Sequence, residues 1–285
     1  MECEMKKVLG VIKRFLLFKL IGYQRLESTI LTLSKFFSID IQLLSYTQMG
    51  ILKYQNEEIS GELFVVNSLL KKHFRCKEDL ILFDVGANVG KYSAMLNSAF
   101  PNSSIYAFEP NSNTFNVLVK NLDCQNINSY QLGLDSKCRK QKMYTYSNDH
   151  ISGHASIYKN VLTDLHGANE LIEIDFETTT VDTFCMGNNI YHIDFMKIDT
   201  EGHELEVLIG ASDMILNNKI DVIQFEFNEM NVVSRVFLKD FYTILSNYNM
   251  YRLDSNRLIP LLKYESRNEI FQFQNFLAIR KQIES

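Results

Sequence analysis

The sequence predicts an α/β protein with a doubly wound, mostly parallel sheet behind a helical N-terminal extension. Two observations predict the sheet: short apolar runs typical of buried strands recur from Leu80 onward, and segments with helical spacing separate them by short turns. A third observation predicts the extension: apolar residues before position 75 recur at three- and four-residue spacing, without proline. We therefore expect helices over residues 1–79 and the α/β domain over residues 80–285.

The elements follow one another in a regular order. The first half of the domain predicts strand 80–84, helix 89–100, strand 105–108, helix 111–123 and strand 127–132. Asn111 stands where a side-chain oxygen can cap the second of these helices. The second half predicts strand 192–198, helix 204–209, strand 221–227, helix 234–247 and strands 250–253 and 273–279. Residues 135–190 interrupt this rhythm, and we interpret their extended pieces at 142–146 and 172–180 as an insertion near the site.

Composition and charge exclude several classes of protein. Hydrophobic residues make up 46% of the chain and charged residues 22%, which is typical of a globular protein rather than a disordered one. A net charge of −5 argues against nucleic acid as the partner. The five cysteines form no CxxC pair, so we expect free thiols in a reducing compartment. Because no apolar run of about 18 residues and no cleavage site is present, we expect a cytoplasmic location without a span or signal peptide.

A glycine-containing turn joins the first strand to its helix. It begins at Asp84 and contains Gly86, Asn88 and Gly90. In a doubly wound sheet this turn lies where a nucleotide-like ligand meets the carboxyl ends of the strands. We expect Gly86 to let the backbone approach a ligand, Asn88 to adopt a left-handed conformation, and Gly90 to let the helix pack tightly on the strand.

Glu109 ends the second strand, at the position from which an acid accepts hydrogen bonds from both hydroxyls of a ribose. The turn before it departs from the dinucleotide fingerprint, because Asn88 and Lys91 stand where that motif requires glycine. No GK[ST] sequence is present, so a phosphate-binding Walker loop is also missing. A nucleotide-sugar or NAD-dependent enzyme is therefore the second hypothesis, and a non-catalytic binding module is the third.

More acidic residues end the later strands. Asp199, Glu201 and His203 follow the strand at 192–198, and Glu226 lies near the end of the next. A carboxylate that ends an apolar strand is costly to bury unless a positive or hydrogen-bonding group meets it. S-adenosylmethionine carries a ribose, positive charge and no phosphate, and therefore suits these acidic strand ends. A helix start in solvent is the alternative for His203, and it is our interpretation of Glu204 and Glu206, whose carboxylates favour the helix dipole there.

At these residues the chain resembles class I S-adenosylmethionine-dependent methyltransferases, and within them the FkbM family. The resemblance rests on FDVGANVGKYS (83–93), YAFEPN (106–111), TTVDTF (179–184), MKIDTEGHELEVLIGA (196–211), VIQFEFNE (222–229) and NFLAIR (275–280). It implies a seven-stranded Rossmann-like methyltransferase sheet and methyl transfer to a hydroxyl of a sugar, polysaccharide or glycosylated natural product. It also implies the cofactor residues Asp84, Gly86, Asn88, Gly90, Glu109, Asp199 and Glu201.

An acceptor hydroxyl must lose its proton, and the sequence offers more than one way to remove it. His203 or Asp199 are the candidate bases, with His154 behind them. Alternatively, Asp199, Glu201 and Glu226 could hold a magnesium ion that polarises the hydroxyl. We favour the route without metal, because each of these carboxylates has another role in binding a cationic cofactor.

The segment from Lys6 to Arg25 contains six basic residues and no acidic one. Its apolar residues fall mostly on the opposite side of a helix from its basic ones. Such a helix can lie on an anionic membrane surface, which would make the location peripheral, or it can cover the core or a partner chain. The acceptor's identity and the oligomeric state stay open.

Overall fold

The structure is a computed structural model, which describes residues 22–122, 127–146, 156–165, 167 and 170–281. His154 and most of the basic segment 6–25 lie outside the described residues. The chain divides into two compact units, residues 1–48 and residues 49–285. In the described part of the chain, no helix has the length and apolar character needed to cross a membrane.

The first unit contains two described helices, α2 (Tyr23–Phe36) and α3 (Ile41–Gln48). No residue of α3 is buried. Large apolar side chains are exposed on and beside α2, and among them Phe36 is 79% and Phe37 62% exposed. The helices predicted for this part of the chain are therefore present over residues 23–48.

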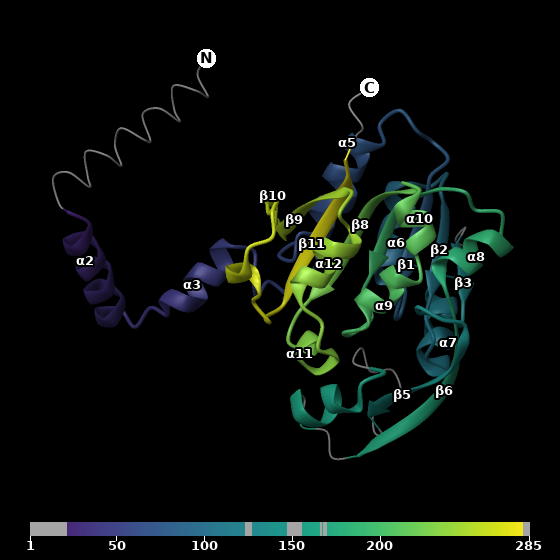
Figure 1. Cartoon of the computed structure of the whole chain (residues 1–285), viewed down its shortest axis with the longest axis horizontal. Helices are drawn as coiled ribbons and strands as arrows, with labels where there is room; N and C mark the ends of the chain where they lie inside the picture. Colours follow the sequence, from purple (N-terminus) through teal and green to yellow (C-terminus); the bar gives the residue numbers. More distant parts are fainter. Residues whose placement is uncertain (1–21, 123–126, 147–155, 166, 168–169, 282–285) are drawn as a thin grey trace. The chain divides into compact units, whose positions relative to one another are not determined.

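The second unit is built on an eight-stranded sheet, seen in Figure 1 with its yellow C-terminal strand β11 between β9 and β8. Its strands are β1 (Ile81–Val85), β2 (Ser104–Phe108), β3 (Ile127–Tyr130), β7 (Ile193–Ile198), β8 (Ile220–Phe227), β9 (Tyr248–Asp254), β10 (Arg257–Pro260) and β11 (Gln274–Arg280). Their order is β10-β9-β11-β8-β7-β1-β2-β3. The five strands from β8 to β3 are parallel, whereas β9, β10 and β11 pair antiparallel. The doubly wound, mostly parallel sheet is thus confirmed, with β10 as an edge strand beyond the seven expected.

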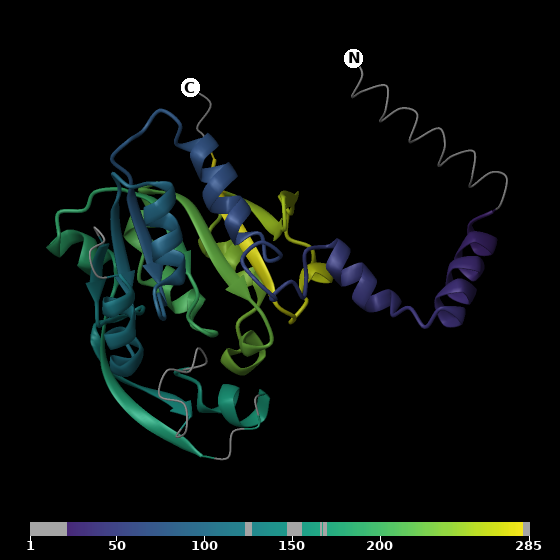
Figure 2. The same cartoon turned by 180° about the vertical axis from the view of Figure 1, so that it is seen from behind.

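Helices cover both faces of this sheet (Figures 1 and 2). They are α4 (Glu62–Phe64), the π-helix η1 (Val65–Leu70), α5 (Lys71–His73), α6 (Lys91–Ala99), α7 (Ser112–Asn121), α8 (Val181–Gly187), α9 (Glu204–Ile209), α10 (Ser212–Leu216), α11 (Met230–Ser234) and α12 (Leu238–Ile244). Side chains of η1, α6 and α7 pack on one face, and side chains of α8, α9, α10 and α12 pack on the other. The strands between them are buried on both faces, as parallel strands in such a sheet are.

Local sequence explains where several helices begin and end. The Asn111 side chain accepts hydrogen bonds from the backbone N–H groups of Asn113 (3.0 Å) and Thr114 (3.5 Å), so it caps α7 as predicted. The helix predicted over 234–247 is shorter and corresponds to α12, while the separate α11 precedes it and ends at Arg235, which is left-handed with φ 59°.

The segment from α4 to α5 packs on the sheet. Val65, Val66 and Leu70 of η1 are fully buried in one cluster with Leu82 of β1. The division between the units consequently falls after residue 48, whereas the sequence pattern placed it after residue 79. Helical spacing shows that a segment has an apolar face, but it does not show which surface that face contacts.

A second, smaller sheet lies beside the carboxyl ends of the main strands. It consists of β4 (Gly133–Leu134), β6 (Leu171–Thr179) and β5 (Arg139–Tyr146), in that order. β5 and β6 pair antiparallel, and they contain the extended pieces expected at 142–146 and 172–180. The predicted insertion therefore forms one wall of the site described next. A 3-10 helix, η3 (Ser266–Asn268), and a second π-helix, η2 (Val161–Leu165), complete the described elements.

Candidate active site

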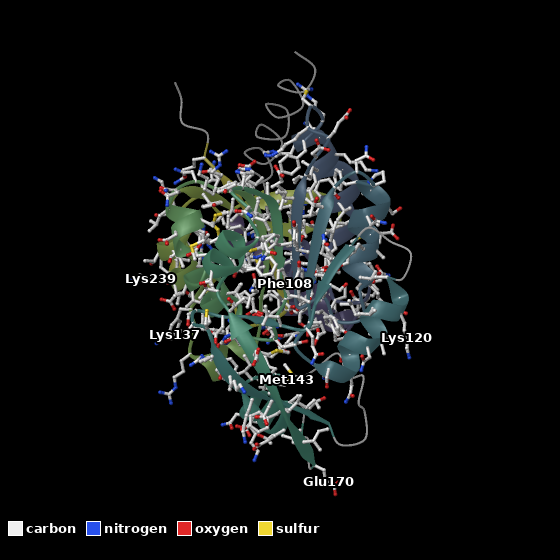
Figure 3. The ribbon with its side chains drawn as sticks, turned by 90° about the vertical axis from the view of Figure 1, so that its right-hand side faces the viewer. Phe108, Lys120, Lys137, Met143, Glu170 and Lys239 are labelled. Carbon is white, nitrogen blue, oxygen red and sulfur yellow. The ribbon has the colours of Figure 1, made fainter. Side chains whose placement is uncertain are left out.

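A cavity lies between the carboxyl ends of β1, β2 and β7 and the smaller sheet. The residues that line it are Val85, Gly86, Asn88, Phe108, Glu109, Pro110, Thr114, Leu132, Gly133, Leu134, Met143, Ile157, Phe176, Asp199, Thr200, Glu201 and His203. Figure 3 labels Phe108 from the main sheet and Met143 from the smaller one, on either side of this region. Its lining contains three acidic side chains and one histidine, and no lysine or arginine among the described residues.

The turn after β1 brings backbone to the cavity. Gly86 has φ +81°, and a Cβ there would lie 1.8 Å from the carbonyl oxygen of Asp199, so only glycine fits. Asn88 is left-handed with φ 49°, as its residue type suggested. Gly90 was expected to pack against the strand; instead its close neighbour is Leu122, whose Cγ would lie 3.0 Å from an added Cβ. Gly90 therefore holds α6 against the end of α7.

Glu109 lines the cavity at the end of β2. Its Oε2 accepts from the backbone N–H of Asn88 at 3.0 Å, and its Oε1 accepts from that of Asn111 at 2.8 Å. Burial raises the pKa of Glu109 to about 7, although both of these hydrogen bonds act to lower it. Each carboxylate oxygen has a second lone pair, so the side chain can still accept from a ligand.

Asp84 is fully buried beneath the turn. Its Oδ2 accepts from the Ser93 hydroxyl at 2.6 Å, while its Oδ1 has no hydrogen-bond partner among the described residues. Burial raises the pKa of Asp84, and the charge of nearby Lys197 opposes that shift. A buried carboxylate oxygen with unused accepting capacity fits a site for a cationic ligand.

Lys197, at the end of β7, is the cation that lies among the carboxylates of Asp199, Glu62 and Asp84. Its Nζ donates to Asp199 Oδ2 at 2.8 Å, lies 4.0 Å from Glu62 Oε1, and stands 4.8 Å from the centre of the Tyr92 ring. Although burial alone would lower the pKa of Lys197, the surrounding carboxylates Asp199, Glu62 and Asp84 raise it above its usual range. Asp199 keeps 34% of its side chain exposed, on the cavity side.

The loop after Asp199 is held in an unusual conformation. Glu201 has φ 55°, a region that costs a non-glycine residue free energy and that occurs frequently at functional sites. Glu204 stabilises this loop: its Oε1 accepts from the N–H groups of Thr200 (2.9 Å) and Gly202 (3.1 Å). The Ser156 hydroxyl adds a hydrogen bond of 3.1 Å to the Glu201 carbonyl. Glu204 is only 2% exposed, so its assignment to a solvated helix start was wrong.

His203 is likewise buried, at 4% exposed, and not a solvent-facing residue. Its Nε2 lies 3.1 Å from Oδ1 of Asp135, and its Nδ1 lies 3.3 Å from the hydroxyl of Tyr158. Neither partner of His203 was predicted from the sequence. Asp135 directly follows the apolar residues of β4, so the signal that identified Asp199, a carboxylate after an apolar run, could have identified it too.

Comparison with known proteins decides the family. The model of the FkbM methyltransferase domain matches residues 84–249, more than half of the chain. The chain belongs to the FkbM methyltransferase family. Its match begins at Asp84 and includes the glycine turn, Glu109, Asp199 and His203.

Curated relatives of this FkbM methyltransferase are distant. The hexuronic acid methyltransferase AglP of Haloferax volcanii is 26% identical over 171 residues, which are 59% of this chain and 63% of that protein. Methyltransferase 1 of Beauveria bassiana is 25% identical over 177 residues, 56% of this chain and 69% of that protein. The chain therefore spans less than two thirds of the first of these. The crystal structure of methyltransferase FkbM from Methylobacillus flagellatus KT has a TM-score of 0.43 and 16% identity, covering 70% of this chain and 44% of that one.

Two further carboxylates belong to the same end of the FkbM methyltransferase sheet. Burial and the neighbouring charge of Asp199 raise the pKa values of Glu201 and Glu226 well above their usual range. Glu226 Oε1 accepts from the side-chain amide of Asn228 at 2.7 Å.

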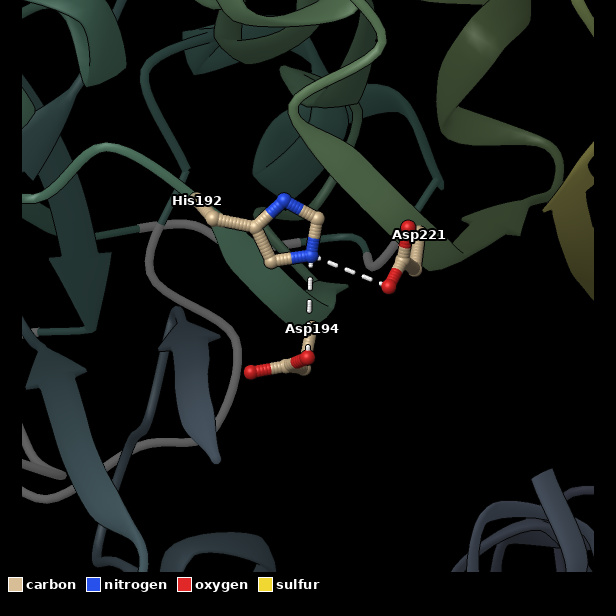
Figure 4. Close-up of side chains that lie close together, drawn as sticks. All are labelled: His192, Asp194 and Asp221. Carbon is tan, nitrogen blue, oxygen red and sulfur yellow. Dashed lines mark hydrogen bonds and ion pairs between the residues drawn. The ribbon is translucent and has the colours of Figure 1, made fainter. Parts of the chain in front are cut away.

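A separate cluster of titratable side chains lies at the opposite, amino-terminal ends of the strands. It consists of His192, Asp194 and Asp221 (Figure 4). Each offers one atom that could bind a metal ion, and these three atoms lie within 4.8 Å of one another; among the described residues this is the group with that geometry. Lys77 and Arg280 already pair with it, the Lys77 Nζ lying 2.5 Å from Asp194 and an Arg280 nitrogen 2.7 Å from Asp221. These ion pairs neutralise the cluster and tie the strand ends together.

Proposed function

We propose that this protein transfers a methyl group from S-adenosylmethionine to a hydroxyl of a sugar, polysaccharide or glycosylated natural product. The observation that carries the proposal is the cavity itself, which has three acidic side chains and no lysine or arginine among its described lining residues. Such a cavity suits a cationic cofactor. Family membership and the relative that acts on a hexuronic acid support the same conclusion.

The residues around the turn after β1 would hold the cofactor. Glu109 would accept the ribose hydroxyls, and Gly86 and Asn88 would bring backbone close to the ligand. Asp84 and Asp199 would provide negative charge for a cationic ligand, with Lys197 fixing the orientation of Asp199. When bound, S-adenosylmethionine supplies a methyl carbon on a positively charged sulfur.

The acceptor would lie on the side of His203, Asp199 and Glu201. Positioning its oxygen for an in-line displacement supplies a large part of the rate enhancement in such reactions. His203 is our candidate for the base that takes the hydroxyl proton, because it lines the cavity and its ring is fixed by two hydrogen bonds. Asp199 would orient the hydroxyl.

The two alternative functions are less well supported. NAD and nucleotide sugars carry a diphosphate, which in proteins is usually met by basic side chains or by a glycine-rich helix N-terminus. The described lining contains acids instead, and Asn88 and Lys91 replace two glycines of the fingerprint. A binding module without turnover would not require a histidine fixed at both ring nitrogens.

A methyl-transfer assay tests the proposal. We expect the protein to move a radiolabelled methyl group from S-adenosylmethionine to a glucuronic acid glycoside, giving an ether that resists alkali. A product cleaved by alkali would be an ester of the sugar carboxylate and would contradict hydroxyl methylation; no product would contradict the proposed function.

A further inference from the structure

We propose that Asp135 is a positioning residue: it holds His203 in the tautomer that turns a basic Nδ1 toward the acceptor. This inference rests on the proposed function and extends it by assigning a role to Asp135 and to Nδ1 of His203. Asp135 lies 68 positions before His203 and outside the family's sequence motifs quoted above.

The hydrogen-bond donors around Asp135 keep its carboxylate charged. It is fully buried, and its Oδ1 accepts from the N–H of Ser136 at 2.6 Å in addition to facing His203. Its Oδ2 accepts from Arg139 at 2.9 Å and from Gln141 at 3.1 Å. Burial would raise the pKa of Asp135, but the hydrogen bonds from His203, Arg139 and Ser136 hold it well below its usual range. A charged carboxylate only accepts, so His203 must donate to it through Nε2–H.

The contact at the other ring nitrogen is compatible with the same tautomer. Burial raises the pKa of Tyr158 to about 12, so its hydroxyl keeps its proton at neutral pH. That hydroxyl lies 3.3 Å from His203 Nδ1 and can donate only to a nitrogen that carries a lone pair. The Asp135 contact places the proton on Nε2, and the neutral ring then has its lone pair on Nδ1, where the Tyr158 hydroxyl can donate.

Nδ1 is the ring nitrogen left to act, because Asp135 engages Nε2. His203 lines the cavity, and the Tyr158 hydroxyl contacts its Nδ1. An acceptor hydroxyl that reaches Nδ1 would take the place of Tyr158 as the hydrogen-bond donor. As the acceptor oxygen forms its bond to the methyl carbon, the carbon–sulfur bond breaks and its electron pair stays on sulfur. The hydroxyl proton passes to Nδ1, and the resulting imidazolium is stabilised by the charge of Asp135 before it releases the proton to water.

The substitution Asp135→Asn tests this assignment because an amide can donate as well as accept. Turned toward His203, its NH₂ group would donate to Nε2 and move the ring proton to Nδ1. The control is Asp221→Asn, which alters a second aspartate–histidine contact, the 2.9 Å pair with His192, at the opposite ends of the strands. Both variants remove one carboxylate from a histidine, but only one of these histidines lines the cavity.

The first readout is nitrogen NMR of protein labelled in its histidines, with the His203 signals assigned from a His203→Gln variant. We expect wild-type His203 to be protonated at Nε2 and bare at Nδ1. Asp135→Asn should move the proton to Nδ1, while Asp221→Asn should leave the His203 signals unchanged. A wild-type ring protonated at Nδ1 would overturn the proposal, even if Asp135→Asn failed to fold.

The second readout is turnover with S-adenosylmethionine and a glucuronic acid glycoside. We expect Asp135→Asn to lower kcat by about 10²–10⁴-fold, the range of a general base, while its affinity for S-adenosylhomocysteine changes by less than about threefold. Turnover of Asp135→Asn equal to that of Asp221→Asn would overturn the positioning role. Failure of the proposed function is distinguishable, since it would show as absent turnover in the wild type, with the NMR result still deciding the tautomer.

Discussion

Glu109, which we propose accepts the ribose hydroxyls, lowers the stability of the folded chain when it is charged. It is 7% exposed, and burial raises its pKa to about 7 from the 4.5 of a solvated glutamate. Between these two pH values the folded chain holds a proton that the unfolded chain has lost. The contribution of Glu109 to stability therefore falls as pH rises through this window, by on the order of 3 kcal/mol in total. At pH values well above 7 the buried charge is fully present, and in the proposed function it would accept from a ribose.

Glu109→Gln should remove this pH dependence. We expect the melting temperature of the variant, relative to the wild type, to rise by several degrees between pH 5 and pH 8, because only the wild type acquires a buried charge in that range. Thermal unfolding of the protein without ligand measures the difference. The exposed Glu177→Gln serves as the control for losing a surface carboxylate. A difference between Glu109→Gln and wild type that does not change with pH would contradict the assigned pKa.

Among the elements, the helical segment from α4 to α5 has the least obvious role. It supplies Val65, Val66 and Leu70 to the core, each fully buried. It also supplies Glu62, one of the carboxylates around Lys197. Burying a large apolar side chain contributes about 1.5–3 kcal/mol, so three of them approach the whole stability of a typical domain, about 5–15 kcal/mol.

Two truncations separate this segment from the first unit. A chain of residues 49–285 should fold cooperatively and bind S-adenosylhomocysteine, since it retains η1 and every described strand. A chain of residues 80–285 should be insoluble or lack a cooperative melting transition, because Leu82 and its neighbours lose their cover. Circular dichroism during heating distinguishes the two. Equal stability of both chains would show that the segment is dispensable.

On the scale of the whole molecule, local sequence patterns predicted the architecture, but they did not predict contacts between residues that are distant in the sequence. The run at 80–84, Gly86 and Glu109 identified the first strand, its turn and the acid after the second strand, because each signal lies within a few residues. The pairing of Asp135 with His203, 68 residues later, has no such local signal, and neither has the cover of the sheet by η1. The strand β10 was missed because its few apolar residues show no clear period.

The same limit applies to the fine chemistry of the site. Sequence placed Asp199, Glu201 and His203 at one strand end, and all three line the cavity. It could not show that Lys197 pairs with Asp199, or that Glu204 folds back to hold the loop at Glu201. Those features depend on side chains that meet only when the parallel strands are aligned.

The central claim is that the acidic cavity binds an S-adenosyl cofactor, which carries no phosphate. Titration calorimetry of the wild-type protein with S-adenosylhomocysteine at pH 8, and in parallel with NAD and UDP-glucose, tests it most directly. We predict saturable binding of one S-adenosylhomocysteine per chain and no heat of binding with NAD or UDP-glucose. The affinity of Glu109→Gln for S-adenosylhomocysteine should be about 10- to 150-fold lower, which is the usual effect of losing hydrogen bonds to a charged acceptor. Binding of NAD or UDP-glucose in place of S-adenosylhomocysteine, or equal affinity in the variant, would contradict the account.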